Sequence, residues 1–508
     1  MTFKRTGIDP LFLVLLLFIA YGYAQSDTMT IDEIHQKYRQ GDTTAAALTQ
    51  SYIDRIHRLN PEFKAVLKLE PAALEQAQKI DISFSKGIWR GPLHGIPVLI
   101  KDNIETKGTL PTTAGSLALV DNITGKDATV VAKLRRAGAI IFGKTNLSEW
   151  ANFRDPKSSS GWSALGGQTG NAHDAARTPS GSSSGSAVAV ALNLAPIALG
   201  TETDGSIISP AASNGIYGIK PSRGVVSRTG VIPLAESQDT VGPMAQSLSD
   251  AMKVLDVISG SDPKDNVTIR KPKISQSGRP ILVKGLRIGT MDLAGFCAPT
   301  RMLFERRLTQ LQNAGGVIIP VQHSPKIQKQ IEHMRRSEFF ILLYELKRDL
   351  GRYLSKTPTK VAARSLAQLI AFNAARPSQE MPYFQQGFFE QSQALDIQNL
   401  KPKYQKLRKD YRAQAKAAIE ALYQTHQLDI LITPSNVPPA KIDHVNGDTR
   451  GGSADTSMPA IAGSTHITLP LGCVRGLPVG LSLIANIAGE AEAFHITQAI
   501  DTVLAQAD

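Results

Sequence analysis

The stretch "DATVVAKLRRAGAIIFGKTN" (residues 127–146) carries two hydrophobic patterns in direct succession. Val131 and Leu134 recur at the spacing of one helical face, and Gly138 ends that pattern. The continuous apolar run over 139–142 that follows is typical of a buried strand. A helix followed at once by a buried strand is the repeating unit of α/β proteins. The stretch therefore predicts a sheet that is covered by helices.

The same alternation of helix and strand patterns extends outward in both directions. Thr30, with Glu33 three residues later, forms a capping box that predicts the start of a helix. Further elements are expected as helices at 43–59, 187–194 and 304–313, and as strands at 97–101, 196–200, 286–289, 317–320 and 428–432. We therefore predict the α/β class, with a central mixed sheet covered by helices on both faces. Residues 337–422 carry helical patterns without a strand signal, and we interpret them as a helical insertion.

The N-terminal segment has the pattern of a secretory signal peptide. Two basic residues precede an apolar run over 11–20, and Gly22 and Ala24 supply the small residues expected before the cleavage site. This run is shorter than the ~20 apolar residues that span a bilayer. We therefore expect residues 1–24 to be removed, which leaves 25–508 as the folded domain of a periplasmic or secreted protein. A retained membrane anchor is the alternative.

The composition excludes several classes of protein. With 42% hydrophobic and 20% charged residues, the chain is neither disordered nor fibrous. Cys297 and Cys473 allow at most one disulfide, and the histidines have no metal-site spacing, so we expect no metal site. The net charge is +12, and most of the excess lies in 301–416. No nucleic-acid-binding motif accompanies it, so we interpret these charges as a solvated helical surface, while an acidic envelope or anionic substrate stays open as a partner.

Two polar islands interrupt the regular pattern at the ends of predicted elements. One spans 158–186 and runs into an alanine and valine helix, and the other spans 201–215 after the next strand. Such ends are where α/β proteins place their sites. Gly181, Ser183 and Gly185 match G-x-S-x-G, the nucleophile elbow, which would make Ser183 the nucleophile of an α/β-hydrolase. An elbow requires a strand before the serine, and the residues before Gly181 show no strand propensity.

A second interpretation rests on a series of ordered motifs. They are "GPLHGIPVLIKDNIETKG" (91–108), "AGAIIFGKTNLSEW" (137–150), "TPSGSSSGSAVAVA" (178–191), "GTETDGSIISPAA" (200–212), "SQDTVGPMA" (237–245) and "GLPVGLSLIA" (476–485). Over about residues 30–260 and 428–500, the sequence resembles the amidase signature hydrolases. Within that family it looks most like the bacterial peptide amidases, which remove the C-terminal amide of peptides. The resemblance implies the amidase signature fold and no cofactor.

The resemblance also implies a Ser–Ser–Lys triad and an oxyanion hole. Ser206 matches the nucleophile, Ser182 the bridging serine on a cis peptide bond, and Lys101 the base. The oxyanion hole corresponds to the backbone N–H groups of Thr203, Asp204, Gly205 and Ser206. Asp204 stands where many members have glycine, and we expect its side chain to face a turn or hydrogen-bond donors.

The chemistry of these residue types supports the same assignment independently. A serine hydroxyl is a weak nucleophile until a base takes its proton, and a lysine can serve only when its ammonium form is disfavoured. Lys101 follows the apolar run 98–100, so burial at a strand end is expected to lower its pKa. The alternative for Lys101 is a salt bridge, for example to Asp102. Gly181 beside Ser182 makes the cis geometry sterically feasible.

Other residues are assigned supporting roles. We expect Asp239 and Thr240 to brace the site, with a turn-capping aspartate as the alternative. Trp162 and Gln168 are candidates to line the acyl pocket, with plain packing as the alternative. Aromatic residues of the helical segment could form a cap over the cleft or belong to its core.

These patterns predict an exported amidohydrolase that releases ammonia from C-terminally amidated peptides. The expected partner is a small-molecule or peptide amide, with no nucleic acid and no stable membrane anchor, and the chain is expected to be a monomer or homodimer. The alternatives are an amidase for small or aryl carboxamides, an esterase that uses Ser183, one component of a tRNA-dependent amidotransferase, and a basic envelope-binding protein without activity.

Overall fold

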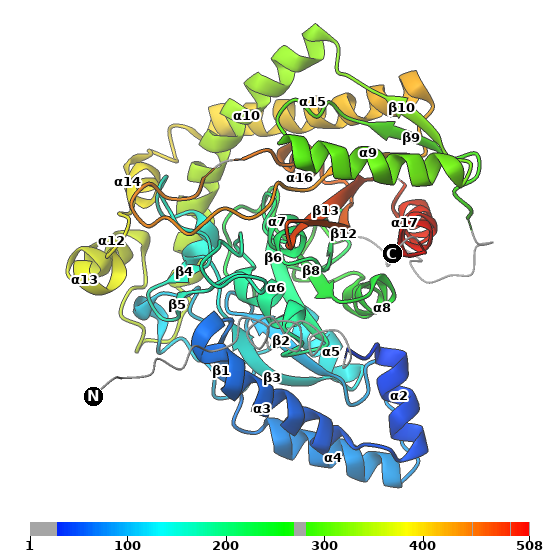
Figure 1. Ribbon diagram of the computed structural model, residues 1–508. Coiled ribbons are helices and arrows are strands. Elements are labelled where there is room, and N and C mark those ends of the chain that lie inside the picture. The colour runs from blue at the N-terminus through cyan, green and yellow to red at the C-terminus, as the bar shows by residue number, and fades with distance from the viewer. Residues whose placement is uncertain (1–27, 269–280, 450, 488, 507–508) are drawn as a thin grey trace, which may run out of the picture.

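The computed structural model describes residues 28–268, 281–449, 451–487 and 489–506 (Figure 1). Within them, eleven strands form one sheet in the order β1, β3, β2, β6, β8, β7, β12, β13, β11, β9, β10. The strands are β1 (Val66–Leu69), β2 (Pro97–Lys101), β3 (Ile140–Thr145), β6 (Ile197–Glu202), β7 (Tyr217–Lys220), β8 (Thr240–Ala245), β9 (Arg287–Thr290), β10 (Val317–Pro320), β11 (Ile430–Pro434), β12 (His466–Val474) and β13 (Leu477–Ile484). A separate two-stranded sheet pairs β4 (Trp162–Ser163) with β5 (Gly167–Gln168).

The large sheet is mixed, as the sequence predicted. β2 is parallel to both β3 and β6, and β9 is parallel to both β10 and β11. The central pairs from β6 through β8, β7 and β12 to β13 are antiparallel.

Helices connect and cover these strands. The α-helices are α2 (Ile31–Gln40), α3 (Ala45–Phe63), α4 (Ala73–Ser85), α5 (Thr129–Arg136), α6 (Ser184–Ala191), α7 (Ile208–Ser213), α8 (Leu248–Ile258), α9 (Ala298–Asn313), α10 (Pro325–Glu345), α11 (Gly351–Leu354), α12 (Leu366–Ala374), α13 (Pro377–Glu380), α14 (Gly387–Ala394), α15 (Lys401–His426), α16 (Ser457–Ala462) and α17 (Glu490–Ala505). Short 3₁₀ segments are η1 (Leu117–Leu119) and η2 (Glu149–Asn152), and η3 (Leu346–Leu350) is a π-helical turn that continues α10.

Helices lie on both faces of the sheet. The chain passes from β2 through α5 to β3 on one side of β2, and from β3 through α6 to β6 on its other side. Because crossovers between parallel strands are right-handed, α5 and α6 must lie on opposite faces. α8 packs against α5, and α7 packs against α6. In Figure 1, α6 and α7 accordingly lie on one side of the central strands and α8 on the other.

The predicted elements appear with shifts of a few residues. The capping box at Thr30 and Glu33 opens α2 as expected. The helix expected at 187–194 is α6, and the strand expected at 196–200 is β6. The long antiparallel pair β12 and β13 was not predicted. β12 contains Pro470, where the register of its pairing with β13 shifts, and proline in an apolar run argues against a strand in sequence-based reasoning.

The segment 337–422 contains helices and no strand in the described chain, as its pattern predicted. Arg154 joins this helical segment to the connection that follows β3: it is fully buried, ion-paired with Glu149 of η2, and donates to the carbonyls of Phe384 and Gln385. Glu380 of α13 lies 3.9 Å from the Arg154 guanidinium, and it accepts a hydrogen bond from the backbone N–H of Leu117 at 2.9 Å. Buried polar contacts therefore join the helical segment to the connections that follow β2 and β3.

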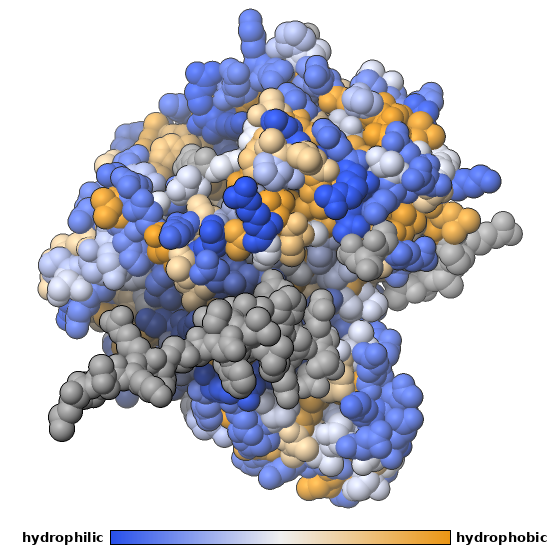
Figure 2. Space-filling model, viewed as in Figure 1, coloured by the Kyte–Doolittle hydropathy of each residue, from blue (hydrophilic) through white to orange (hydrophobic). Residues whose placement is uncertain are grey.

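The surface is largely hydrophilic on the visible face. Figure 2 shows hydrophilic residues along much of the upper edge of the molecule, where α10 and α15 lie. None of the helices in the described ranges combines the length and the apolar composition that a bilayer-spanning segment needs. Cys297 and Cys473 are both exposed, and neither forms a disulfide within the described chain. The predicted signal peptide, residues 1–24, lies outside the described residues.

Candidate active site

The site forms where two neighbouring strands end beside a helix. β2 ends at Lys101, and β6 lies next to it in parallel register, with Ile100 opposite Leu199. The carboxyl ends of parallel strands meet at one edge of a sheet, where α/β proteins bind ligands. Ser182 lies just before the first turn of α6, and Ser206 lies in the turn between β6 and α7. Three distant segments of the sequence therefore converge at this edge.

Lys101 is fully buried and points at hydroxyl groups. Its Nζ lies 2.8 Å from Ser182 Oγ and 3.0 Å from Ser183 Oγ. A third hydroxyl, Thr201 Oγ1, accepts from the same nitrogen at 2.9 Å. These partners are neutral, so the ammonium form gains no direct ion pair from them.

Burial decides the charge state of this lysine. Removal from water lowers the pKa of Lys101 to about 7, although the carboxyl groups of Glu202 and Asp239 act in the opposite direction. The alternative salt bridge to Asp102 does not form. Asp102 faces Lys144 instead, with 3.4 Å between Lys144 Nζ and Asp102 Oδ1. The lowered pKa agrees with the effect of burial that the sequence predicted, and the role of Lys101 as a base stays a prediction.

Ser182 is held by an unusual backbone. The peptide bond between Gly181 and Ser182 is cis, as the resemblance implied. A Cβ atom at position 181 would lie only 2.1 Å from Ser148 Oγ, so this position requires glycine. The Ser148 N–H donates to the Ser182 carbonyl at 3.1 Å and fixes the segment further. Close packing around the bond thus determines where the Ser182 hydroxyl lies.

The carboxylate of Glu202 fixes the turn that carries Ser206. The carboxylate Oε2 of Glu202 accepts hydrogen bonds from the backbone N–H groups of Ile207 at 2.7 Å and Ile208 at 3.0 Å. Gly205 has a φ of 75°, in the left-handed region that favours glycine. The Ser206 carbonyl accepts from the Ser183 N–H at 3.1 Å, which joins this turn to the start of α6.

Several backbone N–H groups of the same turn have no hydrogen-bond acceptor in the described chain. Within the described residues, no backbone N–H group from 203 to 206 donates a hydrogen bond, and neither does the Ser206 hydroxyl. Ser182 and Ser206 are likewise not hydrogen-bonded to each other. Catalytic hydrogen bonds are often long in ligand-free enzymes and tighten in the substrate complex. A row of free N–H groups beside a serine is the arrangement that stabilises an oxyanion.

Asp204 does not place its charge in this row. Its Oδ2 accepts a hydrogen bond from the Ser457 hydroxyl at 2.6 Å, at the start of α16. Burial raises the pKa of Asp204, which the Ser457 hydrogen bond partly offsets. The expectation that this side chain faces hydrogen-bond donors is confirmed.

Asp239 braces the turn from the side. Its Oδ1 accepts from the Thr203 hydroxyl at 2.6 Å, and its Oδ2 accepts from the N–H groups of Leu234 and Ala235, both at 2.9 Å. Burial raises the pKa of Asp239 to about 7, against the effect of these hydrogen bonds. Thr240 pairs with Glu202 between β8 and β6, but its hydroxyl contacts no partner in the described chain.

Trp162 and Gln168 lie opposite each other on β4 and β5. Trp162 is buried, with Tyr383 and Phe384 of the helical segment packed edge-on against its ring. Gln168 accepts a hydrogen bond from His444 Nε2 at 2.8 Å. No hydrogen bond of the described chain links either residue to Lys101, Ser182 or Ser206, so their role in an acyl pocket stays a prediction.

Sequence reasoning missed part of the lysine's surroundings. Ser183 does not follow a strand, because β5 ends at Gln168, and it serves as a hydrogen-bond partner of Lys101 and of the Thr201 carbonyl. Thr201 and Glu202 were not singled out, although both lie in a motif that was recognised. Pairing β6 with β2 in parallel would have placed Thr201 beside Lys101, and this pairing cannot be read from either strand alone.

A buried lysine among serine hydroxyls, next to a turn of backbone N–H groups on a mixed α/β sheet, indicates a hydrolytic enzyme of the α/β class. The comparisons with known proteins agree with this class. The model of the amidase family matches residues 47–494, and the chain belongs to that family. Its fold is the amidase signature fold, and the protein is a hydrolase acting on amides.

Three relatives show the extent of the similarity. A probable amidase of Arabidopsis thaliana is 37% identical over 465 residues, which cover 89% of this chain and 85% of the plant protein. A glutamyl-tRNA(Gln) amidotransferase subunit of Microcystis aeruginosa is 32% identical over 484 residues, covering 93% of this chain and 97% of that protein. The native peptide amidase of Stenotrophomonas maltophilia, a solved structure, is 40% identical with a TM-score of 0.85, covering 94% of this chain and 97% of that chain.

Proposed function

We propose that this amidase hydrolyses the C-terminal amide of peptides and releases ammonia, using Lys101, Ser182 and Ser206 as a triad. The observation that carries the proposal is the 2.8 Å contact from Lys101 Nζ to Ser182 Oγ in a fully buried setting without a hydrogen-bonded carboxylate. The similarity to a peptide amidase over nearly the whole chain supports the substrate class.

In the acylation step, neutral Lys101 takes the proton of Ser182 while Ser182 takes the proton of Ser206. Ser206 Oγ then attacks the carbonyl carbon of the carboxamide, and the N–H groups of 203–206 stabilise the negative oxygen. The lysine proton returns through Ser182 to the nitrogen, the C–N bond breaks, and ammonia leaves. The products of this half-reaction are ammonia and an ester of Ser206.

In the deacylation step, water replaces ammonia and follows the same path in reverse order. The triad takes a proton from the water, hydroxide adds to the ester carbonyl, and the proton returns to Ser206 Oγ as the carboxylic acid leaves. Lys101 is neutral again at the end of the cycle. The site therefore needs no group beyond its own side chains and backbone.

Two alternatives use the same protein differently. An amidase for small or aryl carboxamides would use the same triad on another acyl group. An esterase that uses Ser183 would need that hydroxyl exposed, whereas Ser183 is fully buried and donates its proton to the Thr201 carbonyl at 3.0 Å. Its position favours a role in holding Lys101 over a role as nucleophile.

The test measures ammonia release from C-terminally amidated peptides, with simple aliphatic and aryl carboxamides as a parallel panel. We expect the highest kcat/KM for amidated peptides. Ser206→Ala is expected to abolish turnover and labelling by a fluorophosphonate, and Ser183→Ala to retain both. Preference for an aryl carboxamide would replace the substrate class, and labelling of Ser183 would overturn the triad.

We also propose that the chain acts outside the cytoplasm after removal of residues 1–24. The basic start, the short apolar run and Ala24 support this proposal. N-terminal sequencing of the protein isolated from its own cells checks it, and a mature N-terminus at Gln25 is expected. Recovery of the intact leader would overturn cleavage.

A further inference from the structure

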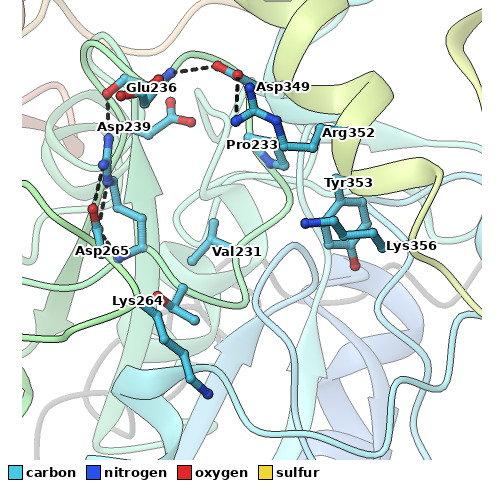
Figure 3. Close-up of a pocket in the computed structure, with 12 residues that line it drawn as sticks. Val231, Pro233, Glu236, Asp239, Lys264, Asp265, Asp349, Arg352, Tyr353 and Lys356 are labelled. Carbon is cyan, nitrogen blue, oxygen red and sulfur yellow. Dashed lines mark hydrogen bonds and ion pairs between the residues drawn. The ribbon is translucent and has the colours of Figure 1, made fainter.

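Two neighbouring cavities lie close to the site, and Thr201 and Thr203 line one of them. The outer one is an open pocket with a volume of about 320 Å³, in which Lys264 and Lys356 are exposed. Figure 3 shows it with Asp239 near its Glu236 edge and Val231 toward its middle. The inner one is enclosed and has a volume of about 10 Å³. Arg228, Val231 and Asp239 line both cavities, so they form the wall between them.

The inner cavity has a mixed polar and apolar lining, and two of its polar side chains have an atom without a hydrogen-bond partner in the described chain. Asn103, Thr201 and Thr240 line it. Asn103 Oδ1 and Thr240 Oγ1 are buried and have no hydrogen-bond partner within the described chain. Buried polar atoms are almost always hydrogen-bonded, to protein or to ordered water. A cavity of roughly 10 Å³ lined by several polar groups has the size and chemistry for about one water molecule.

Thr201 connects this cavity to the lysine. Its Oγ1 accepts hydrogen bonds from Lys101 Nζ and from Asn103 Nδ2, each at 2.9 Å. Both of these contacts bring a proton to the oxygen, so the threonine's own proton is left to donate toward the cavity. Lys101 has no exposed surface, so any proton that it exchanges with solvent must pass through one of its partners.

We propose that Thr201, one water molecule in the inner cavity and Asp239 form a relay that carries protons between Lys101 and the solvent of the outer pocket. The inference deepens the proposed function, because it matters only where Lys101 is the base. It gives the buried lysine a route to its neutral form that does not pass through Ser182 and Ser206.

The proton balance of the relay is simple. Lys101 gives a proton to Thr201 Oγ1 while Thr201 gives its own proton to the water. The water then passes a proton to the carboxylate of Asp239, and Asp239 releases it to a buffer base in the outer pocket. The net change is a neutral Lys101 and a protonated buffer, and the reverse sequence recharges the lysine.

The charged groups around the two ends fit this transfer. Lys101 faces Glu202 and Asp239, and burial lowers the pKa of its ammonium to about 7. Asp239 faces Arg228 as well as the donors of Thr203, Leu234 and Ala235, and burial raises its pKa to about 7. Because the two groups bind protons with similar strength, a proton can pass between them with little change in free energy.

A pH jump tests the relay directly. The enzyme is held at pH 5.5, where Lys101 is charged, and mixed to pH 8 in a stopped-flow instrument with p-nitrophenyl acetate, whose acylation of Ser206 releases coloured p-nitrophenolate. In wild type we expect a burst without a resolved lag. In Asp239→Asn we expect a lag at least about tenfold longer, which imidazole shortens in proportion to its concentration, since proton transfer by a positioned group typically contributes ~10²–10⁴-fold.

The controls separate a relay from a merely structural role. Lys356→Gln alters an exposed side chain of the outer pocket and is expected to behave as wild type. Thr240→Val keeps the shape of the cavity wall but removes one hydrogen-bond partner of the water. We expect it to show an imidazole-sensitive lag that is shorter than the lag of Asp239→Asn. If Asp239→Asn does not fold, Thr240→Val serves as the test variant. A slower burst without an imidazole-sensitive lag in both variants would overturn the relay.

The readout also separates this inference from the proposed function. The chromogenic ester reports acylation of the serine whether or not peptide amides are substrates. Failure of amidated peptides with an intact, buffer-sensitive lag would remove the substrate class and leave the relay standing. Turnover of amidated peptides with no lag in either variant would support the substrate class and overturn the relay.

Discussion

Two fully buried lysines lie at the ends of adjacent strands, and they do opposite things. Lys101 ends β2, and Lys144 lies near the end of β3. Lys144 pairs in register with Ile100, not with Lys101, so the two side chains point to opposite faces of the sheet. Lys144 Nζ lies 3.4 Å from Asp102 and donates to the Ile104 carbonyl at 2.6 Å, whereas Lys101 meets neutral hydroxyls.

The difference shows that burial alone does not make a lysine reactive. Desolvation lowers the pKa of both ammonium groups, but at Lys144 the charge of Asp102 and a hydrogen bond to it act against this effect. A carboxylate in contact supports the charged form of a lysine, and breaking such a buried pair is costly. Hydroxyl partners support the charge less, so the amine loses its proton more readily. On the proposed function, the neighbours therefore distinguish a catalytic lysine from a structural one.

The largest expected effect comes from replacing Lys101, which has no carboxylate as a hydrogen-bond partner within the described chain. Lys101→Met should lower kcat/KM for an amide by about 10²–10⁴-fold, the usual contribution of a positioned base. Methionine is apolar and of similar length, so the variant should unfold at the same temperature as wild type or above it. Amide turnover and thermal denaturation measure the two effects. An active variant would show that Lys101 is as structural as Lys144.

The second effect concerns the paired lysine. Lys144→Met should destabilise the fold by about 3–5 kcal/mol, because it leaves the buried carboxylate of Asp102 without its cation. The folded fraction should keep its activity. The double variant Asp102→Asn with Lys144→Met should recover most of the stability, as measured by denaturant unfolding. Loss of kcat at unchanged stability would erase the distinction between the two sites.

The third effect is on pH dependence. In the proposed mechanism the neutral amine of Lys101 is the base, so kcat/KM should rise with pH and level off above about pH 7, following its lowered pKa. In the unfolded chain the amine keeps its ordinary pKa of 10.5, so between about 7 and 10.5 the unfolded state binds more protons than the folded state. Stability therefore rises with pH across that window. Lys101→Met should reduce the slope, which denaturant titrations at several pH values can measure.

Most helices and strands could be predicted from the sequence, and so could the choice of Lys101, Ser182 and Ser206 as candidate residues. Helix and strand periods located β2, β3 and β6, and the apolar run before Lys101 predicted its burial. The pairing of distant strands was not accessible, because period and propensity describe one segment at a time. The link from Asp239 to Thr203 and the place of Thr201 beside Lys101 depend on that pairing. The Asp102 and Lys144 pair was missed for the same reason, since it joins two strands.

The smallest expected effects come from the same chemical change made beside each lysine. Ser183→Ala removes one of the hydroxyls that accept from Lys101 and so weakens the support of its charged form. The pKa of Lys101 should fall further, and the acid limb of kcat/KM should move to lower pH with less than about a tenfold change in rate. Thr112→Val removes the hydroxyl that accepts from Lys144 at 3.0 Å.

That second change should cost about 1 kcal/mol of stability and leave the pH profile where it is. Each variant is the control for the other, because both delete a single buried hydroxyl next to a buried ammonium. A shifted pH profile in Thr112→Val, or an unshifted one in Ser183→Ala, would mean that the hydroxyl partners do not set the proton affinity of the base. The neutral surroundings of Lys101 would then have to act through desolvation alone.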